Sequence, residues 1–443
     1  MTPGGTSQRL NGIGIEIGYT ANDLLATLRD RLYPNMIANL TQNTHAPISS
    51  LNQSNPEAEL LLCCIRYHFG TATSSEIAHL LQTELDWDYL IQKAAEHNVF
   101  LLFYQSLKQT HPELILPSIA ETLHIQAQTR LARNLFLTKE LFQILDLFAT
   151  HDIQAIPFKG LIWAALAYGN MGVREFCDLD ILVRPADFPK AKNLLMQQGY
   201  HDKYLGTKEQ EIAQVQMVRQ DGKVNIDLHF GLIPEQFYRR LDTDSFFEEL
   251  QTVSIAGKTV HTFSPKNSVA LGYLHGMKDS WGVLKRLCDF AALIRKYPDV
   301  DWQDVMARCE TTESDRNFLL AILITQTYLQ IPVPEPLLKQ TQKFPELSEI
   351  AEEHKQLFYR VELGAKCRLF GGLILFPIME MGFWGKIRYC AGLALNVNER
   401  DKETFALPDF LFFLYYPLRI VRLLKTYKIG KEKLAFLWKF LWK

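Results

Sequence analysis

Residues Phe158 to Tyr200 read FKGLIWAALAYGNMGVREFCDLDILVRPADFPKAKNLLMQQGY, and this stretch contains the clearest signals for the fold. The short apolar run QAIPF, which ends at Phe158, predicts a strand, and LIWAALAYG predicts a helix. DLDILV predicts a second strand, and ADFPKAKNLLMQQGY predicts a helix that ends at a glycine. Further along, QEIAQVQMVR and KVNIDLHF predict two strands joined by a turn at residues 220–222. This order of elements predicts a small α/β unit with a mixed sheet.

Two carboxylates stand on one face of the second predicted strand. Because side chains alternate between the faces of a strand, Asp178 and Asp180 point the same way. Neighbouring carboxylates repel each other, and Mg²⁺, which prefers oxygen ligands, removes that penalty. Asp227, in the later run NIDLH, offers a third carboxylate with the same alternation. Three carboxylates on neighbouring strands predict a site for two metal ions, one to activate an attacking oxygen and one to neutralise a leaving pyrophosphate.

The surroundings of the D-x-D pattern favour a site, although the pattern alone is common and its simplest interpretation is a solvated strand end. Lys159 and Gly160 lie at a strand-to-helix junction, where backbone N–H groups and the helix dipole favour a phosphate. Arg174 lies just before the strand and either reaches a phosphate or pairs with Asp178 or Asp180. Together these residues predict a metal and phosphate site.

The quoted stretch resembles the signature of the uncharacterised nucleotidyltransferases, a bacterial branch of the polymerase-beta superfamily. The shared pattern is lysine-glycine, a helix with a tyrosine, an arginine, D-x-D on a strand, and a helix that ends in Gly-Tyr. VNIDLHF is similar to the family's third-carboxylate strand, HGMKDSWGVLKRLCDFAALI to its helical segment, and LPDFLFFLYYPLRIVRLLKTYK to its C-terminal end. The resemblance extends over roughly residues 56 to 428.

The resemblance implies a Mg²⁺-dependent enzyme that uses two metal ions to move a nucleoside monophosphate from an NTP to a hydroxyl or similar acceptor. The acceptor stays open between a small molecule and a peptide or protein. Asp178 and Asp180 would bind both metals, and Asp227 would bind the catalytic metal and help to activate the acceptor.

The phosphate loop departs from the superfamily's usual Gly-Ser or Gly-Gly. The corresponding pair is Lys159-Gly160, followed by Leu161, so no serine hydroxyl is available to the triphosphate. Lys159 would supply a point charge instead. The gap between Gly160 and Asp178 is also longer than in the usual form. The alternative is therefore a catalytically degenerate protein that binds a nucleotide or acts as a scaffold.

Two further sets of residues belong to the candidate site. Helical spacing places four polar residues on one face: His275, Lys278, Lys285 and Asp289. A solvated face is the usual explanation, whereas the resemblance implies that Lys278 or Lys285 reaches the triphosphate. His229 lies on the same side of its strand as Asp227 and is either a supporting group behind the metal or a packed histidine at the sheet edge.

The overall composition limits the partners. The 443 residues carry a formal net charge of −2, so bulk nucleic-acid binding is not expected. The seven cysteines form no C-x-x-C pair, which favours reduced thiols and a cytoplasmic location. No apolar stretch reaches the roughly 17 residues of a membrane span.

The tail from Arg419 to Lys443 is basic, with eight Lys or Arg residues and the single acid Glu432. Leu, Phe and Trp alternate with these cations, which predicts a basic amphipathic helix. Such a helix either lies on an anionic membrane or an acidic partner, or packs on the protein with its lysines extended into solvent.

We therefore expect an α+β fold in which a small mixed-sheet nucleotidyltransferase core is flanked by N- and C-terminal helical domains. The expected parts are a poorly ordered segment with one helix (1–55), a helical domain (56–151), the α/β core (152–263), a second helical domain (264–345) and an aromatic-rich segment with the basic tail (346–443).

Overall fold

The structure is a computed structural model that describes residues 55–203, 214–232, 244–278, 281–309, 316–360, 401, 404–405 and 407–426. Contacts between Cα atoms divide the chain into Met1–Gln53 and Ser54–Lys443, and all described residues belong to the second unit. The segment 1–55, predicted to be poorly ordered, lies outside the described residues except for Asn55.

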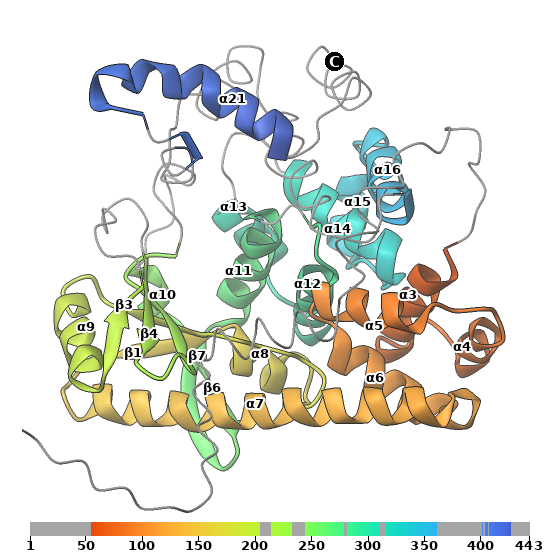
Figure 1. The fold of residues 1–443 in the computed structure, drawn as a ribbon, viewed down its shortest axis with the longest axis horizontal. Coiled ribbons are helices and arrows are strands. Elements are labelled where there is room, and N and C mark those ends of the chain that lie inside the picture. The colour runs from red at the N-terminus through yellow and green to blue at the C-terminus, as the bar shows by residue number, and fades with distance from the viewer. Residues whose placement is uncertain are drawn as a thin grey trace, which may run out of the picture. The chain divides into compact units, whose positions relative to one another are not determined.

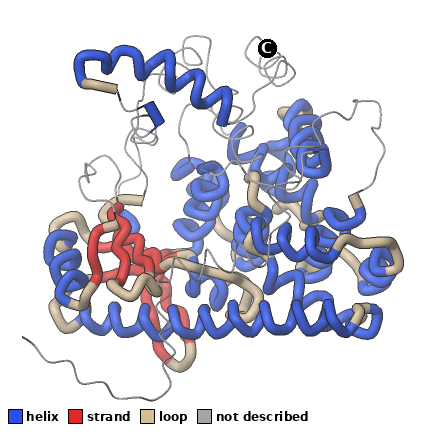
Figure 2. Tube along the Cα trace, in the orientation of Figure 1, coloured by secondary structure: helices blue, strands red, loops and turns tan. Residues whose placement is uncertain are grey.

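A five-stranded mixed sheet forms the α/β part, in the order β1-β2-β5-β4-β3. β2 and β5 are parallel, and the other neighbouring pairs are antiparallel. Every residue of β2 is buried, as expected for a central strand with both faces covered. The strands are β1 (Ala155–Phe158), β2 (Leu179–Val183), β3 (Tyr200–Asp202), β4 (Gln214–Arg219) and β5 (Asn225–His229). The predicted mixture of helices and a small mixed sheet is confirmed (Figure 2).

A separate hairpin, β6 (Leu250–Ile255) and β7 (Lys258–Phe263), was not predicted from the sequence. Its turn is formed by Ala256 and Gly257, which both have positive φ (49° and 80°), as a two-residue hairpin turn requires. β7 contacts β1, and Thr262 Oγ1 donates to the Pro157 carbonyl over 2.8 Å. The hairpin therefore braces the strand that leads into Lys159.

The helices before the sheet end in one very long helix. α7 has 33 residues and contacts α6, β1 and α9, so it links the first helices to the sheet (Figure 1). The helices of this region are α3 (Pro56–His68), α4 (Ser74–Leu81), α5 (Trp87–Glu96), α6 (Phe100–Thr110), η1 (Pro112–Leu114) and α7 (Pro117–Ala149).

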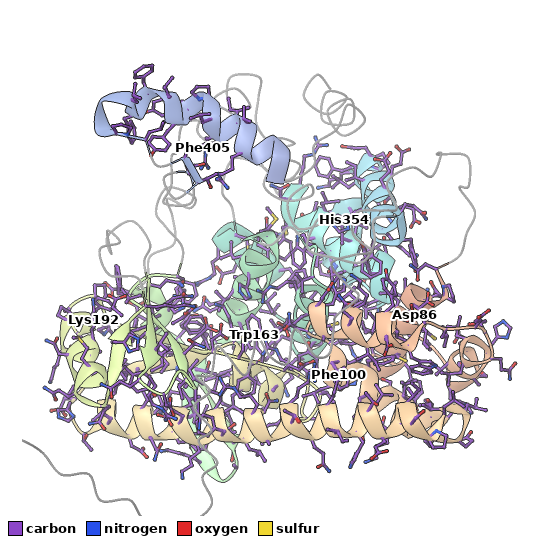
Figure 3. The ribbon with its side chains drawn as sticks, viewed as in Figure 1. Asp86, Phe100, Trp163, Lys192, His354 and Phe405 are labelled. Carbon is purple, nitrogen blue, oxygen red and sulfur yellow. The ribbon has the colours of Figure 1, made fainter. Side chains whose placement is uncertain are left out.

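Three short helices are inserted between the strands: α8 (Gly160–Leu166), α9 (Phe188–Gln197) and α10 (Ser245–Glu248). α8 is almost completely buried and contacts β1, β6 and α12. Its Trp163 is 1% exposed and lies among the packed side chains at the centre of the molecule (Figure 3).

The helices after the hairpin pack against those before the sheet. Arg66 Nε donates to the Tyr328 carbonyl over 2.8 Å, and Thr71 Oγ1 to the Leu329 carbonyl over 2.6 Å. These later helices are α11 (Pro265–Lys278), α12 (Leu284–Lys296), α13 (Trp302–Cys309), α14 (Arg316–Leu329), α15 (Glu335–Thr341) and α16 (Glu346–Arg360). The division into five parts stays a prediction.

Near the C-terminus the structure describes η4 (Asp409–Leu414) and α21 (Tyr415–Thr426). Asp401 is buried and accepts from both Arg419 and Arg422. Residues 427–443 of the predicted basic tail lie outside the described residues. Among the residues that the structure describes, no helix combines the length and the apolar character of a membrane span.

Candidate active site

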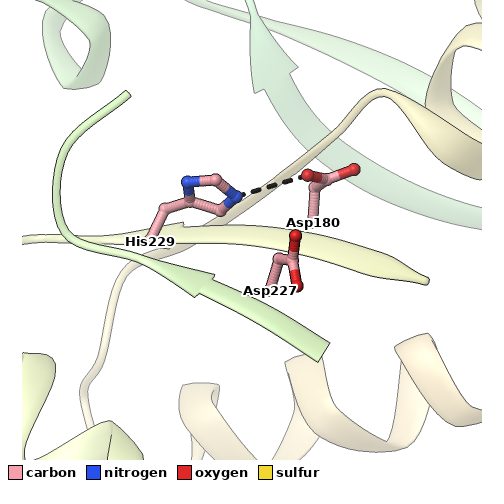
Figure 4. Close-up of side chains that lie close together, drawn as sticks. All are labelled: Asp180, Asp227 and His229. Atoms are coloured by element: carbon pink, nitrogen blue, oxygen red, sulfur yellow. Dashed lines mark hydrogen bonds and ion pairs between the residues drawn. The ribbon is translucent and has the colours of Figure 1, made fainter. Parts of the chain in front are cut away.

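Asp180 and Asp227 lie side by side on adjacent strands. The parallel register of β2 and β5 pairs Asp180 with Asp227 and Leu182 with His229, so Asp180, Asp227 and His229 lie on one face of the sheet. Ligand atoms of these three residues lie within 4.8 Å of one another (Figure 4). Asp180 and His229 are buried and Asp227 is half-buried.

Asp180 is charged in spite of its burial. Its Oδ1 lies 2.8 Å from Lys159 Nζ and 3.3 Å from His229 Nε2. Burial alone would raise the pKa of Asp180, but the Lys159 ammonium and the hydrogen bond from His229 hold that pKa well below its ordinary value. The imidazole therefore donates from Nε2, and its buried Nδ1 has no partner among the described residues.

Asp227 has the opposite electrostatic character. Burial, followed by the negative charge of Asp180, raises the pKa of its carboxyl. Its Oδ2 accepts a hydrogen bond from Gln214 Nε2 over 3.2 Å. The pair thus combines one carboxylate that stays ionised with one that accepts a proton more readily.

Lys159 lies on a strained turn between β1 and α8. Its φ of 54° and ψ of −135° fall in a region that favours glycine, and holding another residue there costs about 1–3 kcal/mol. The ammonium also lies 4.8 Å from the centre of the Phe158 ring. Gly160 follows with a φ of 25°, which also explains the glycine at that position.

Asp178 lies in the bend that precedes β2 and is half-buried. It is outside the group that Asp180, Asp227 and His229 form. Its charge nevertheless contributes to the raised pKa of Asp227, behind burial and Asp180. Its assignment as a metal ligand stays a prediction.

Arg174 pairs with Asp289. One interpretation of the sequence pairs it with Asp178 or Asp180, but neither of these residues is its hydrogen-bonded partner. Its Nε and Nη2 donate to the two carboxylate oxygens of Asp289 over 2.6 and 2.8 Å. Nη1 donates to the Gly160 carbonyl over 2.9 Å. The guanidinium therefore ties the start of α8 to α12.

The predicted polar stripe is divided between two helices. α11 ends at Lys278, whose side chain lies outside the described residues, and α12 begins at Leu284. His275 Nδ1 lies 3.0 Å from Arg286 Nη1. Lys285 is half-buried, and burial followed by the nearby charge of Arg174 lowers its pKa to about 8.

Two residues of the site were missed or misjudged from the sequence. Gln214 was not singled out, because a glutamine in a predicted strand gives no signal of the carboxylate beside it. Asp289 was assigned to a polar face, yet it is 2% exposed. Its position within the apolar run LCDFAALI was the available signal that it needs a buried cation.

A mixed sheet that presents carboxylates from two adjacent strands, beside a lysine on a strand-to-helix turn, suits metal-assisted chemistry on phosphate esters. The family model described as uncharacterised nucleotidyltransferase matches residues 83–330, more than half of the chain, and the protein belongs to this family. The match includes the whole stretch from Lys159 to Asp289 and confirms the family that the sequence motifs indicated. Neither the curated proteins nor the solved structures provide a match.

Proposed function

We propose that the protein is a Mg²⁺-dependent nucleotidyltransferase that moves an NMP group from an NTP to a small-molecule, peptide or protein acceptor. The observation that carries this proposal is the in-register pair Asp180 and Asp227, with His229 within 4.8 Å. The two carboxylates supply the oxygen ligands that Mg²⁺ and Mn²⁺ prefer. We also propose that the protein is cytoplasmic and that it belongs to the bacterial branch of the family.

Asp178, Asp180 and Asp227 are the proposed metal ligands, and two ions are expected. Bound metal would polarise the phosphate and the attacking oxygen. Asp180, whose pKa is held low, would keep its negative charge at any moderate pH. The Asp227 carboxylate, whose pKa is raised, is the group suited to take the proton from the acceptor hydroxyl.

The triphosphate is expected to bind close to the carboxylates. The residues proposed to bind or position it are Lys159, Gly160, Arg174, Lys278 and Lys285. Lys285 is suited to a direct contact, because a lysine that is partly desolvated gains from an anionic ligand. The bonds of Arg174 to Asp289 and Gly160 favour an indirect role, in which it holds the start of α8 in place.

Incubation with each labelled NTP and Mg²⁺ or Mn²⁺ tests the proposal through release of pyrophosphate or a labelled product. Asp180→Asn and Asp227→Asn, which keep the side-chain shape and remove the charge, are expected to abolish turnover. Unchanged turnover in both variants would exclude the carboxylate pair as the catalytic centre.

The second candidate function is a nucleotide-binding or scaffold protein without turnover. It is favoured by Lys159, which stands where the superfamily's phosphate loop has a glycine and which neutralises a carboxylate of the site. Calorimetry would then detect nucleotide or partner binding that needs no divalent ion. Metal-dependent turnover of any NTP would rule this candidate out.

A further inference from the structure

The ammonium of Lys159 occupies the position next to Asp180 that a cation would take. It lies 2.8 Å from Oδ1, and this same oxygen also receives the hydrogen bond from His229. The ion pair is buried, since the side chains of Lys159 and Asp180 are 11% and 7% exposed. The Asp180 carboxylate is therefore already neutralised, and the Lys159 ammonium in contact with it repels an approaching divalent ion.

The backbone shows that this placement is imposed by the fold. Glycine would adopt the conformation of residue 159 without strain, and the chain has a lysine there. The β7 strand braces β1, and Arg174 fixes the carbonyl of Gly160, so both sides of the turn are held. The turn thus presents the ammonium to the carboxylates at a cost in backbone energy.

Displacement of Lys159 by a free ion would be unfavourable. A buried ammonium that loses its carboxylate keeps its desolvation penalty and gains nothing in exchange. A metal ion that arrives with a triphosphate brings phosphate oxygens, which are strong acceptors for the displaced ammonium. Lysine suits such an exchange, because its ammonium is a point charge on a flexible stem.

We propose that Lys159 is a displaceable counter-ion, an inference that rests on the proposed function. Lys159 makes the site bind a divalent ion together with a triphosphate, and it disfavours binding of the free ion. By linkage, the triphosphate raises the affinity for the ion, and the ion raises the affinity for the triphosphate to the same extent. In the ligand-free protein the same lysine keeps the buried carboxylate neutralised.

The test uses the full chain, Mn²⁺ as the ion and inorganic tripolyphosphate as the anion, so that no choice of base is needed. Calorimetry and the electron paramagnetic resonance signal of unbound Mn²⁺ give two affinities for each protein. One is the affinity for free Mn²⁺, and the other is the affinity for the Mn²⁺–tripolyphosphate complex. Neither readout depends on catalytic activity.

We expect Lys159→Met to bind free Mn²⁺ about tenfold more tightly than the wild type, and the complex about tenfold more weakly, the effect of one charge-assisted hydrogen bond in each case. Lys159→Gln, which retains a hydrogen-bond donor without a charge, is expected to behave in the same way. Lys159→Arg should keep the wild-type preference. Lys285→Met, the matched loss of the other lysine that is proposed to contact the triphosphate, should weaken binding of the complex and leave the affinity for free Mn²⁺ nearly unchanged.

Failure of this inference is distinguishable from failure of the proposed function. If the wild type binds neither Mn²⁺ nor the complex, both are overturned. If the wild type binds the complex, and folded Lys159→Met and Lys159→Gln bind free Mn²⁺ no more tightly than the wild type does, the counter-ion role is overturned and the proposed function stands. Circular dichroism establishes that each variant is folded.

Discussion

Two buried ion pairs meet the start of α8, and they differ in how firmly they are held. Lys159 contacts one oxygen of Asp180, in a site that Asp227 and His229 share. Arg174 contacts both oxygens of Asp289, and its remaining nitrogen donates to a backbone carbonyl. A single point-charge contact can be exchanged for another anion, whereas a bidentate pair with fixed geometry cannot be exchanged easily.

The surroundings reinforce this difference. Tyr168 donates to Asp289 Oδ1 over 2.9 Å, and the Arg174 guanidinium lies 5.5 Å from the centre of the Trp163 ring. Both carboxylate oxygens of Asp289 therefore accept a hydrogen bond from the protein. Asp180 instead lies beside the half-buried Asp227, which leaves negative charge for a ligand cation. One pair is suited to function and the other to the stability of the fold.

Removal of the charge of each aspartate is expected to have the largest effect and to separate the two ion pairs most clearly. Asp180→Asn is expected to lower the rate of the proposed nucleotide transfer by at least about a thousandfold while the protein stays folded, because a proposed metal ligand is lost. Asp289→Asn is the matched control, and its main effect should be on thermal stability. Equal losses of rate in the two folded variants, measured as pyrophosphate release, would contradict the division of roles.

Replacement of the two cations compares the pairs by stability. Arg174→Met should lower the free energy of unfolding by about 3–5 kcal/mol, because it leaves the Asp289 carboxylate buried without its cation. Lys159→Met should cost less, about 1–2 kcal/mol, since His229 still donates to Asp180. Urea unfolding followed by circular dichroism measures both.

The double variant Arg174→Met with Asp289→Leu serves as the control for the Arg174 pair. Apolar side chains in place of both partners should recover most of the loss, because no unpaired charge remains. A double variant as unstable as Arg174→Met alone would show that shape rather than charge decides the effect.

Much of the sheet and one half of the site were predictable from the sequence. Alternation in DLDILV grouped Asp178 with Asp180, and alternation in NIDLH grouped Asp227 with His229, because the side-chain period of a strand is local information. The parallel register that brings Asp180 next to Asp227 is a long-range property, which alternation does not specify. The family motif supplied the expectation that these strands are neighbours.

The partner of Arg174 could not be predicted. Arg174 and Asp289 are 115 positions apart, and their pairing depends on how α12 packs on α8. The expected single polar stripe failed for a related reason, because α11 ends at Lys278 and the helical period does not continue into α12. The β6–β7 hairpin was missed because its strands mix polar and apolar residues without a strong apolar run.

The backbone conformation at residue 159 contributes a smaller difference in stability. Lys159→Gly and Lys159→Met both remove the ammonium, and only the glycine also relieves the positive φ. The glycine variant should therefore be more stable than the methionine variant by about 1 kcal/mol. Equal midpoints of urea unfolding would indicate that the turn carries no strain of its own.

The smallest expected effect concerns Lys285, which is close to the Arg174–Asp289 pair and is proposed to contact the triphosphate. Its pKa is lowered to about 8 from an ordinary value of 10.5. In the free protein Lys285 is therefore charged below about pH 8 and loses its proton as the pH rises beyond that. Because the unfolded chain keeps this proton up to higher pH, the contribution of Lys285 to stability should increase between about pH 8 and 10.5.

Binding should change in the opposite direction. The affinity for the Mn²⁺–tripolyphosphate complex is expected to fall by about fivefold between pH 7.5 and pH 9, because a neutral amine no longer attracts the anion. Lys285→Arg, which stays charged throughout, should lose this dependence, whereas Lys285→Met should be weak at both pH values. The same decline in all three proteins would assign the pH dependence to another group and place Lys285 with the structural pair.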